Sequence, residues 1–466
     1  MHKLLPHLNA DVEVTGRNQD VYTVKVNGTA GGRGLTRPVQ FNIPVPRNKA
    51  DARMYAYVID SMSKRLVYLT PFVFQNDSLL KLGSYLLNDA SASAGTLYEY
   101  IYTIDRFCRW IQKTPDQLMM ECMGPDGLPD VKTVQRHSQL LYDWYLELKA
   151  DGLAGQTLAH YLKGPKALYA SNGLQLPWSH RINRRVVCKD RAPRPEELQL
   201  LLDIADLRDR VIISCLALGG FRESTLARLC YRHVREDLEN GTSSIHVHVE
   251  AEITKGKYND YDTFLGDEAT HFIREYLKLR RQGTRYTPPE EIHDESPLIR
   301  NKNCKKPKGV TAPGLYVAIH KLYRKTNMLG TKRGRRYMLR PHSIRKFFRT
   351  QMGALGVPPD YIEYMMGHTI STYNDIQMKG TEFLRNIYAA SGLSIRPKTA
   401  LSKVDALKEI IRAWGMNPEE ILTREALSIR HHRYATPYDR EENHIKTLRR
   451  SLKEMMRKEL LDKKQA

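Results

Sequence analysis

The chain has 466 residues, enough for two or three domains with hydrophobic cores of their own. Its 73 lysines and arginines outnumber its 52 acidic residues, which gives a formal net charge of +21 at pH 7. Such an excess is typical of proteins that bind a polyanion, usually nucleic acid, although a solvated basic surface has the same composition. No apolar run of about 18 residues and no signal peptide are present, so we expect no membrane partner. The six cysteines form no C-x-x-C pair, which argues against a zinc site or a disulfide scaffold and favours a reducing cytoplasm.

The first 60 residues alternate apolar and polar side chains in three short runs, at residues 12–14, 21–26 and 39–43. Several glycines punctuate these runs as turns. A period of two is typical of half-buried strands, so we predict a small β-rich segment over residues 1–60, with a partly disordered leader as the alternative. The pattern assigns this segment no function.

Over residues 61–177 the apolar side chains recur at spacings of three and four, which is typical of amphipathic helices. The pattern predicts helices over residues 72–87, 93–111, 133–148 and 153–169, the last one broken at Gly164-Pro165. Short connections between them predict a small helical bundle. Its lysines and arginines would either face a phosphate backbone or form a solvated surface, and this segment alone does not distinguish the two.

Residues 178–194 predict a basic linker, because five arginines and one lysine lie there among few apolar side chains. A basic linker between two basic domains suits a clamp that closes around DNA, with the linker crossing the phosphates. The alternative is a plain flexible tether.

A second domain is predicted over residues 195–395. In it, Gly219-Gly220 places Arg222 at the start of a helix, where free backbone amides favour an anion. Residues 244–265 alternate as two strands joined at a polar tip that carries Lys255. A lysine on such a hairpin can reach into a groove and donate a proton, although most turn lysines are merely solvated. Further helices are expected over residues 196–205, 209–217, 272–279 and 314–323, followed by a basic helical tail over residues 396–466.

The stretch from residue 339 to residue 388 concentrates the side chains that bear chemistry. His342 and Arg345 are three apart in a helical run, so both can point to one side of that helix. His368 follows Gly367 at a break between two apolar runs, and two tyrosines, Tyr373 and Tyr388, come after it. Cationic donors beside a phenol suit the binding of an anion and attack on it.

The order of these motifs resembles the catalytic domain of the tyrosine recombinase (phage integrase) family. The matching segments are Gly220-Phe221-Arg222, Ile253-Thr254-Lys255-Gly256-Lys257, Arg340-Pro341-His342-Ser343-Ile344-Arg345 and Met366-Gly367-His368. The helical region before the linker resembles the core-binding domain of that family. The resemblance covers roughly residues 65–395 and implies a mainly α fold with a small β-sheet, that is, an α+β catalytic domain behind a helical DNA-binding domain.

The resemblance implies that a tyrosine attacks a DNA phosphodiester and holds the 3′ phosphate covalently. Arg222 and Arg345 would stabilise the charge that grows on the phosphate oxygens, because guanidinium binds them bidentately and stays charged. His342 and His368 would donate hydrogen bonds or exchange a proton, and Lys255 would protonate the leaving 5′ oxygen. Rejoining would need neither ATP nor metal, so we expect no cofactor.

This sequence departs from the family pattern at two places. The family usually carries an acidic residue three positions after the first arginine, and Thr225 stands there. The nucleophile usually follows the second histidine by about nine residues, where this chain has Gln377. Tyr373 is nearer to that spacing, whereas Tyr388 lies in a credible helix over residues 381–390 whose local sequence resembles the nucleophile helix of the family. We give Tyr388 a slight preference and keep Tyr373 as the alternative.

We therefore expect a site-specific recombinase or integrase that acts on duplex DNA as a homo-tetramer, integrating or excising a mobile element. An accessory DNA-bending protein is a possible further partner, the expected location is the cytoplasm in association with the nucleoid, and the tail is a candidate for subunit contact. Two alternatives remain open: a DNA-relaxing enzyme resembling type IB topoisomerases, and an inactive DNA-binding protein on the same scaffold.

Overall fold

A computed structural model gives the structure of the protein. It describes residues 5, 8–18, 20–31, 33–90, 93–184, 186, 188–242, 244–254, 259–285, 287–302, 304, 306–332, 336–370, 375–395, 403–428 and 437–465. The chain divides into two compact units, Met1–Val187 and Cys188–Ala466. Each unit is described by itself below.

The first unit begins with a small antiparallel sheet, which confirms the β-rich segment. Its strands β1 (Val12–Arg17), β2 (Val21–Val26) and β5 (Val39–Pro44) lie in the order β1-β2-β5, while β3 (Thr29–Ala30) and β4 (Arg33–Gly34) form a separate short ladder. The inner face of the sheet, including Val24 and Phe41, belongs to the same hydrophobic cluster as the helices that follow. The β segment therefore shares one core with the helical region.

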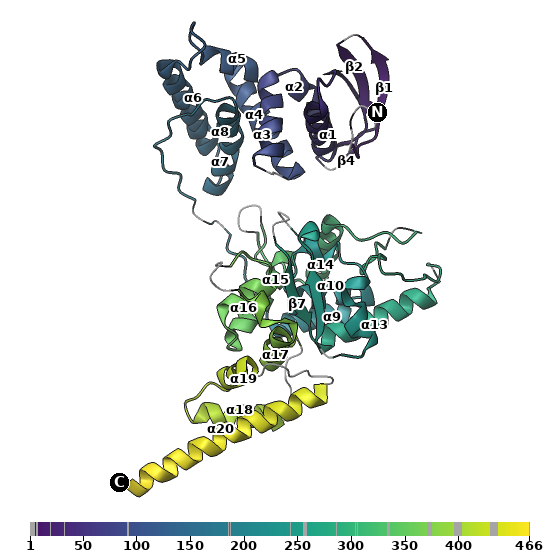
Figure 1. The fold of residues 1–466 in the computed structure, drawn as a ribbon, viewed down its shortest axis with the longest axis vertical. Helices are drawn as coiled ribbons and strands as arrows, with labels where there is room; N and C mark the ends of the chain where they lie inside the picture. The colour runs from purple at the N-terminus through teal and green to yellow at the C-terminus, as the bar shows by residue number, and fades with distance from the viewer. Residues whose placement is uncertain are drawn as a thin grey trace. The chain divides into compact units, whose positions relative to one another are not determined.

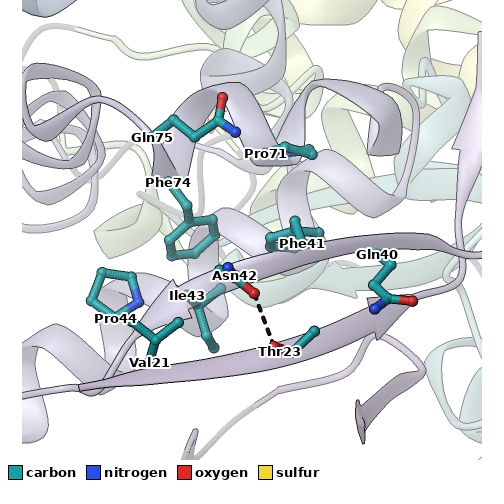
Figure 2. A pocket seen from close by; sticks show the side chains of 10 residues that line it. All are labelled: Val21, Thr23, Gln40, Phe41, Asn42, Ile43, Pro44, Pro71, Phe74 and Gln75. Atoms are coloured by element: carbon teal, nitrogen blue, oxygen red, sulfur yellow. Dashed lines mark hydrogen bonds between the residues drawn. The ribbon is translucent and has the colours of Figure 1, made fainter. Parts of the chain in front are cut away.

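A hollow of about 480 Å³ lies where β2 and β5 meet the end of the helix α2 (Thr70–Phe74). Figure 2 shows the rings of Phe41 and Phe74 on one side of it and the hydrogen-bonded pair Thr23 and Asn42 on the strands. None of the ten side chains that line the hollow is ionisable, so it offers no acid, base or cation for catalysis.

The rest of the first unit is helical, and Figure 1 shows β1 and β2 at one end of it and α6 at the other. The helices are α1 (Lys49–Ser63), the 3₁₀ turn η1 (Val67–Leu69), α2, α3 (Asp77–Asn88), α4 (Ala94–Ile111), α5 (Pro115–Glu121), α6 (Val131–Ala150), α7 (Gly155–Tyr161) and α8 (Lys163–Ser171). The predicted helix over 72–87 is thus two helices, α2 and α3. The predicted break at Gly164-Pro165 was misplaced, since both residues lie in the first turn of α8, where a proline is tolerated because its missing N–H would have no helical partner.

The close contact of α8 with α4 explains why residue 164 is a glycine. A Cβ on Gly164 would lie 2.1 Å from the hydroxyl of Thr103 and 2.7 Å from the carbonyl of Tyr100, so only glycine lets the two helices approach this closely. The core between them contains Leu97, Ile101 and Leu168, all buried.

The second unit packs its helices around a two-stranded antiparallel ladder. The strands β6 (Ile245–Val249) and β7 (Tyr261–Leu265) pair with His248 opposite Asp262, as the hairpin prediction requires. Ile253, expected in a strand, lies in a 3₁₀ turn, η2 (Ala251–Ile253). The helices of this part are α9 (Pro195–Ile204), α10 (Leu207–Leu218), α11 (Glu223–Leu226), α12 (Arg232–Glu239), α13 (Asp267–Gln282), α14 (Ala312–Lys325), α15 (Pro341–Ala354), α16 (Pro359–Met365), the 3₁₀ turn η3 (Gln377–Lys379) and α17 (Thr381–Ser391).

The end of the predicted linker is anchored on the second unit. Asp190 accepts hydrogen bonds from Arg340 at 2.7 Å and Lys346 at 2.5 Å, and the amide of Arg191 donates to the carbonyl of Met338 at 3.1 Å. These contacts hold residues 188–191 against the start of α15, the helix that carries His342 and Arg345.

The C-terminal helices are α18 (Lys403–Ala413), α19 (Pro418–Ser428) and α20 (Pro437–Gln465). They pack on α17 through α19 and α20. α19 packs against both α17 and α20, and α17 also contacts β7, so α17 is enclosed between the β6–β7 ladder and the C-terminal helices (Figure 1). Every residue from Phe383 to Ser391 is accordingly buried. Among the described residues, no helix is both long enough and apolar enough to cross a membrane.

Candidate active site

Two arginines from distant parts of the second unit converge on one turn of the chain. Arg222 precedes the short helix α11, and its Nη1 donates to the carbonyl of Gly367 at 3.1 Å and to that of Met366 at 3.4 Å. Arg345, in the second turn of α15, donates from Nη2 to the same Met366 carbonyl at 2.6 Å. The two guanidinium groups therefore lie side by side, although 123 positions separate them in the sequence.

Glycines in the left-handed region form both turns that receive these hydrogen bonds. Gly220 has φ +62° and presents its carbonyl to Nη1 of Arg345 at 2.6 Å, while Gly367 has φ +62° and presents its carbonyl to Arg222. An aromatic ring packs against each turn: a Cβ on Gly220 would lie 2.6 Å from the ring of Phe348, and one on Gly367 would lie 2.5 Å from the ring of Tyr261. Both positions thus require glycine for conformation and for space.

The arginine pair carries positive charge that no carboxylate neutralises directly. Among the residues that the structure describes, neither Arg222 nor Arg345 forms an ion pair, and their partners are backbone carbonyls and the ring of His368. Arg345 is only 2 % exposed. Burial, together with the nearby charge of Arg222, lowers the pKa of Arg345 to about 10, so the group remains charged at neutral pH. An uncompensated cationic pair of this kind is suited to an anion from solution.

His368 extends the arginine pair with a group that can move a proton. Its Nε2 lies 3.0 Å from Nη2 of Arg345, and its Nδ1 contacts the carboxylate of Glu363. Because a guanidinium has only donors, Nε2 must accept, which leaves the ring proton on Nδ1, facing Glu363. Burial alone would raise the pKa of Glu363, but hydrogen bonds from His368 and Arg349 outweigh it and lower that pKa.

His342 lies on the same helix as Arg345 but contacts it less closely. It occupies the first turn of α15 and its side chain is exposed. Partial desolvation of its ring lowers the pKa of His342, and the charge of Arg345 acts in the same direction against the opposing effect of Glu223. The structure therefore brings Arg222 and Arg345 together on the shared Met366 carbonyl, puts His368 in contact with Arg345, and places His342 on the same helix as Arg345.

Two of the predicted site residues, Lys255 and Tyr373, fall outside the described residues. The strands that lead to and from residues 255–258 are described and pair as predicted.

Tyr388 lies in the core of the second unit. It is 2 % exposed, its hydroxyl donates to the carbonyl of Leu218 at 2.8 Å, and it accepts from the amide of Gly266 at 3.0 Å. Its ring lies 5.7 Å from that of Phe264 on β7. These contacts attach α17 to the end of α10 and to the start of α13.

Thr225, at the position where an acidic residue was expected, is buried under the arginine pair. Its hydroxyl and that of Tyr261 are both buried and lie next to each other. Burial raises the pKa of Tyr261 to about 12 against the lowering effect of Arg345 and Arg222. The floor of the site is therefore neutral and polar.

Sequence reasoning missed Glu363, which orients His368, and the role of the Met366 carbonyl. The only signal for Glu363 was its place five residues before His368, and an acidic residue near a helix end is too common to single out. A carbonyl has no signature in the sequence at all. No set of three His, Cys, Asp or Glu side chains in the described part of the chain is arranged to hold a metal ion.

The family model described as "Phage integrase family" matches residues 193–378. These residues form a phage integrase family domain. The match contains Arg222, Arg345 and His368, so the residues that converge in the structure lie within the part of the chain that the family model matches. It also spans Tyr373 and ends before Tyr388.

Several solved structures of integrases and recombinases resemble this chain at low identity. The XerA recombinase is 21 % identical, with a TM-score of 0.30, over 63 % of this chain and 90 % of that one. The Tn1549 transposon integrase in complex with transposon right end DNA is 16 % identical, with a TM-score of 0.43, over 72 % and 98 % of the two chains. A lambda integrase dimer bound to a core site is 12 % identical, with a TM-score of 0.40, over 63 % and 92 %. No curated protein matches the chain.

Proposed function

We propose that this protein is a site-specific tyrosine recombinase that cuts and rejoins duplex DNA through a covalent 3′-phosphotyrosine intermediate. The observation that carries the proposal is the convergence of Arg222 and Arg345 on the Met366–Gly367 turn, with His368 against Arg345. The match of the phage integrase family to the same residues supports it. The net charge of +21 supports duplex DNA as the partner.

The arginine pair would bind the scissile phosphate through its non-bridging oxygens. A phosphodiester resists attack because its negative charge repels a nucleophile, and its oxygens gain charge in the transition state. Two preorganised guanidinium groups above a buried neutral floor stabilise that charge more than water does, because they need no reorientation. His368, with Nε2 as acceptor, would take a proton or hold a phosphate oxygen once protonated.

We assign the nucleophile to Tyr373, which reverses the preference that the sequence suggested. Tyr388 would have to break two backbone hydrogen bonds and leave a core position to attack a phosphate. Tyr373 lies only five residues beyond His368 and within the family match. Its phenolate oxygen would attack phosphorus, the bond to the 5′ oxygen would break, and that oxygen would take a proton.

The remaining roles follow the family resemblance. Lys255 would donate the proton to the leaving 5′ oxygen, and His342 would hydrogen-bond a phosphate oxygen from the first turn of α15. Exchange between two duplexes requires four cuts, so we propose a homo-tetramer on DNA. Integration or excision of a mobile element, with an accessory DNA-bending protein as a further partner, would use this chemistry. Such a protein would work in the cytoplasm, in association with the nucleoid.

A nicked suicide duplex tests the proposal. Cleavage should release a short fragment and leave the protein covalently bound, visible as a shifted band on a denaturing gel. Arg222→Ala and Arg345→Ala should abolish the band, whereas Arg235→Ala, which removes an exposed arginine, should leave it unchanged. Mass spectrometry of the adducted peptide would identify Tyr373 or Tyr388. A band that survives loss of both arginines would refute the mechanism.

A DNA-relaxing enzyme resembling type IB topoisomerases would use the same chemistry, but nothing in the site favours it. Relaxation of a supercoiled plasmid by a monomer, without joining of two sites, would identify that activity. DNA binding without any covalent adduct would instead identify an inactive binding protein.

A further inference from the structure

We propose that Asp262 is a positioning residue of the active site, which holds the Met366–Gly367 turn in register with the two arginines through Tyr364. The inference rests on the proposed function, since it assigns a part in that reaction to a residue that does not touch the phosphate. It follows from a continuous chain of hydrogen bonds between β7 and the turn.

The first link joins β7 to α16. The hydroxyl of Tyr364, one residue before the end of α16, donates to Oδ2 of Asp262 at 2.6 Å. Tyr364 is 5 % exposed and Asp262 is 9 % exposed, so water does not compete strongly for this bond. A buried hydrogen bond to a carboxylate is among the stronger ones in proteins.

The second link joins Tyr364 to the turn itself. Its backbone carbonyl accepts from the amide of Gly367 at 2.8 Å, so the residue that Asp262 fixes also closes the turn. The next carbonyls along this turn, those of Met366 and Gly367, are the acceptors for Arg345 and Arg222. A shift of Tyr364 would therefore move both acceptors and His368 with them.

The other oxygen of Asp262 keeps the carboxylate in place. Oδ1 contacts Nε2 of His246 at 2.8 Å and Nδ1 of His248 at 2.9 Å, both on β6. Burial opposes the charge, but these histidines and Tyr364 outweigh it and lower the pKa of Asp262 to about 2. The group is thus a permanent acceptor at any working pH.

The neighbouring residue of β7 supports the second turn in the same way. The hydroxyl of Thr263, which is fully buried, donates to the carbonyl of Gly219 at 2.9 Å, next to Gly220. One strand therefore fixes both glycine turns that align Arg345. This arrangement explains why two consecutive polar residues, Asp262 and Thr263, occupy a fully buried strand.

The test compares two variants, each of which loses one buried tyrosine hydroxyl. Tyr364→Phe keeps the ring and loses the bond to Asp262, whereas Tyr323→Phe removes a buried hydroxyl that has no hydrogen-bond partner among the described residues. We expect Tyr364→Phe to slow adduct formation on saturating suicide duplex about tenfold. The dissociation constant for DNA should stay unchanged, because a duplex is held by many phosphate contacts besides the one at the arginine pair. Tyr323→Phe should match the wild-type protein in both measurements. If Tyr364 had a purely structural role, Tyr364→Phe would lower the melting temperature but would not slow adduct formation at an unchanged dissociation constant for DNA.

A double-mutant cycle tests whether Asp262 acts on the rate of adduct formation through its hydrogen bond with Tyr364. Asp262→Asn should slow adduct formation by a similar factor, and the double variant should be no slower than the slower single variant, because both changes break the same link. Equal rates in Tyr364→Phe and wild type, or additive losses in the double variant, would overturn the inference.

Inorganic phosphate gives a readout that does not depend on cleavage. It should raise the melting temperature of the wild-type protein, and Tyr364→Phe should need several times more phosphate for the same rise. If the wild-type protein forms no adduct, the proposed function fails, and this titration then decides the inference alone. An unchanged phosphate midpoint in Tyr364→Phe would refute it.

Discussion

The hydroxyl of Tyr388 donates a hydrogen bond of 2.8 Å to the backbone carbonyl of Leu218, the last residue of α10. The same oxygen accepts from the amide of Gly266, directly before α13. One phenol thus pairs with a carbonyl at the end of α10 and with an amide directly before α13. This is the arrangement of a structural tyrosine.

Tyr388→Phe should therefore lower stability and retain cleavage. It leaves the Leu218 carbonyl and the Gly266 amide unpaired, which should cost about 1–3 kcal/mol of the free energy of unfolding. Chemical denaturation measures the loss, and the suicide duplex measures the adduct. Tyr373→Phe should behave in the opposite way, with normal stability and no adduct. Loss of the adduct in a well-folded Tyr388→Phe protein would restore Tyr388 as the nucleophile.

Gly367→Ala should abolish cleavage, because the new methyl group would lie 2.5 Å from the ring of Tyr261 and displace the carbonyls that align both arginines. Gly392→Ala is the matched control. Gly392 has φ +63°, against +62° at Gly367, but a Cβ there meets no atom within 4 Å. Both variants should lose about 1 kcal/mol from backbone strain, while only Gly367→Ala should lose adduct formation. Equal activity of the two variants would contradict the role of this turn.

The buried ion pair between Arg385 and Asp237 predicts a large loss of stability from a single truncation. The two side chains are 4 % and 8 % exposed and lie 2.7 Å apart. Arg385→Ala would leave Asp237 buried without its cation, which should cost about 3–5 kcal/mol of the free energy of unfolding. Arg235→Ala breaks a similar pair that is about half exposed, and should cost about 0–1 kcal/mol. Similar losses from both variants would contradict the burial of Arg385.

Asp262 should contribute to acid unfolding. Its pKa is lowered from 3.8 to about 2 in the folded protein, so its contribution is present above pH 4 and is lost as the pH falls from about 4 to 2. That contribution is about 2 kcal/mol by linkage. Asp262→Asn should flatten the fall in stability over this window, as measured by denaturation at each pH. An equally steep fall in the Asp262→Asn protein would contradict this contribution.

The order of the catalytic motifs could be predicted because each residue type has a local signature. Gly219-Gly220 predicts a turn before Arg222. The spacing of three between His342 and Arg345 predicts that both lie on one face of a helix. The structure brings Arg222 and Arg345 together. The helix over residues 93–111 also agrees closely with α4, since its apolar spacing is regular and Ser93 precedes it.

The remaining features depend on contacts between distant residues. The carbonyl of Met366 becomes a joint acceptor only when α11 and α15 meet the end of α16. Tyr388 resembles a nucleophile by its local sequence, and only the closing of α17 onto Leu218 and Gly266 shows that its hydroxyl is occupied. Asp262 lies in a strand whose alternation marks it as an ordinary polar position, and its three partners come from β6 and α16.

The enclosure of α17 has a consequence for handling the protein. Its outer side is covered by α19, which α20 supports in turn. A chain shortened before residue 403 would expose the apolar side chains of α17 that α19 covers, and should become prone to aggregation while retaining Arg222, Arg345 and His368. Purification tags and fusion partners should therefore follow α20 rather than replace it.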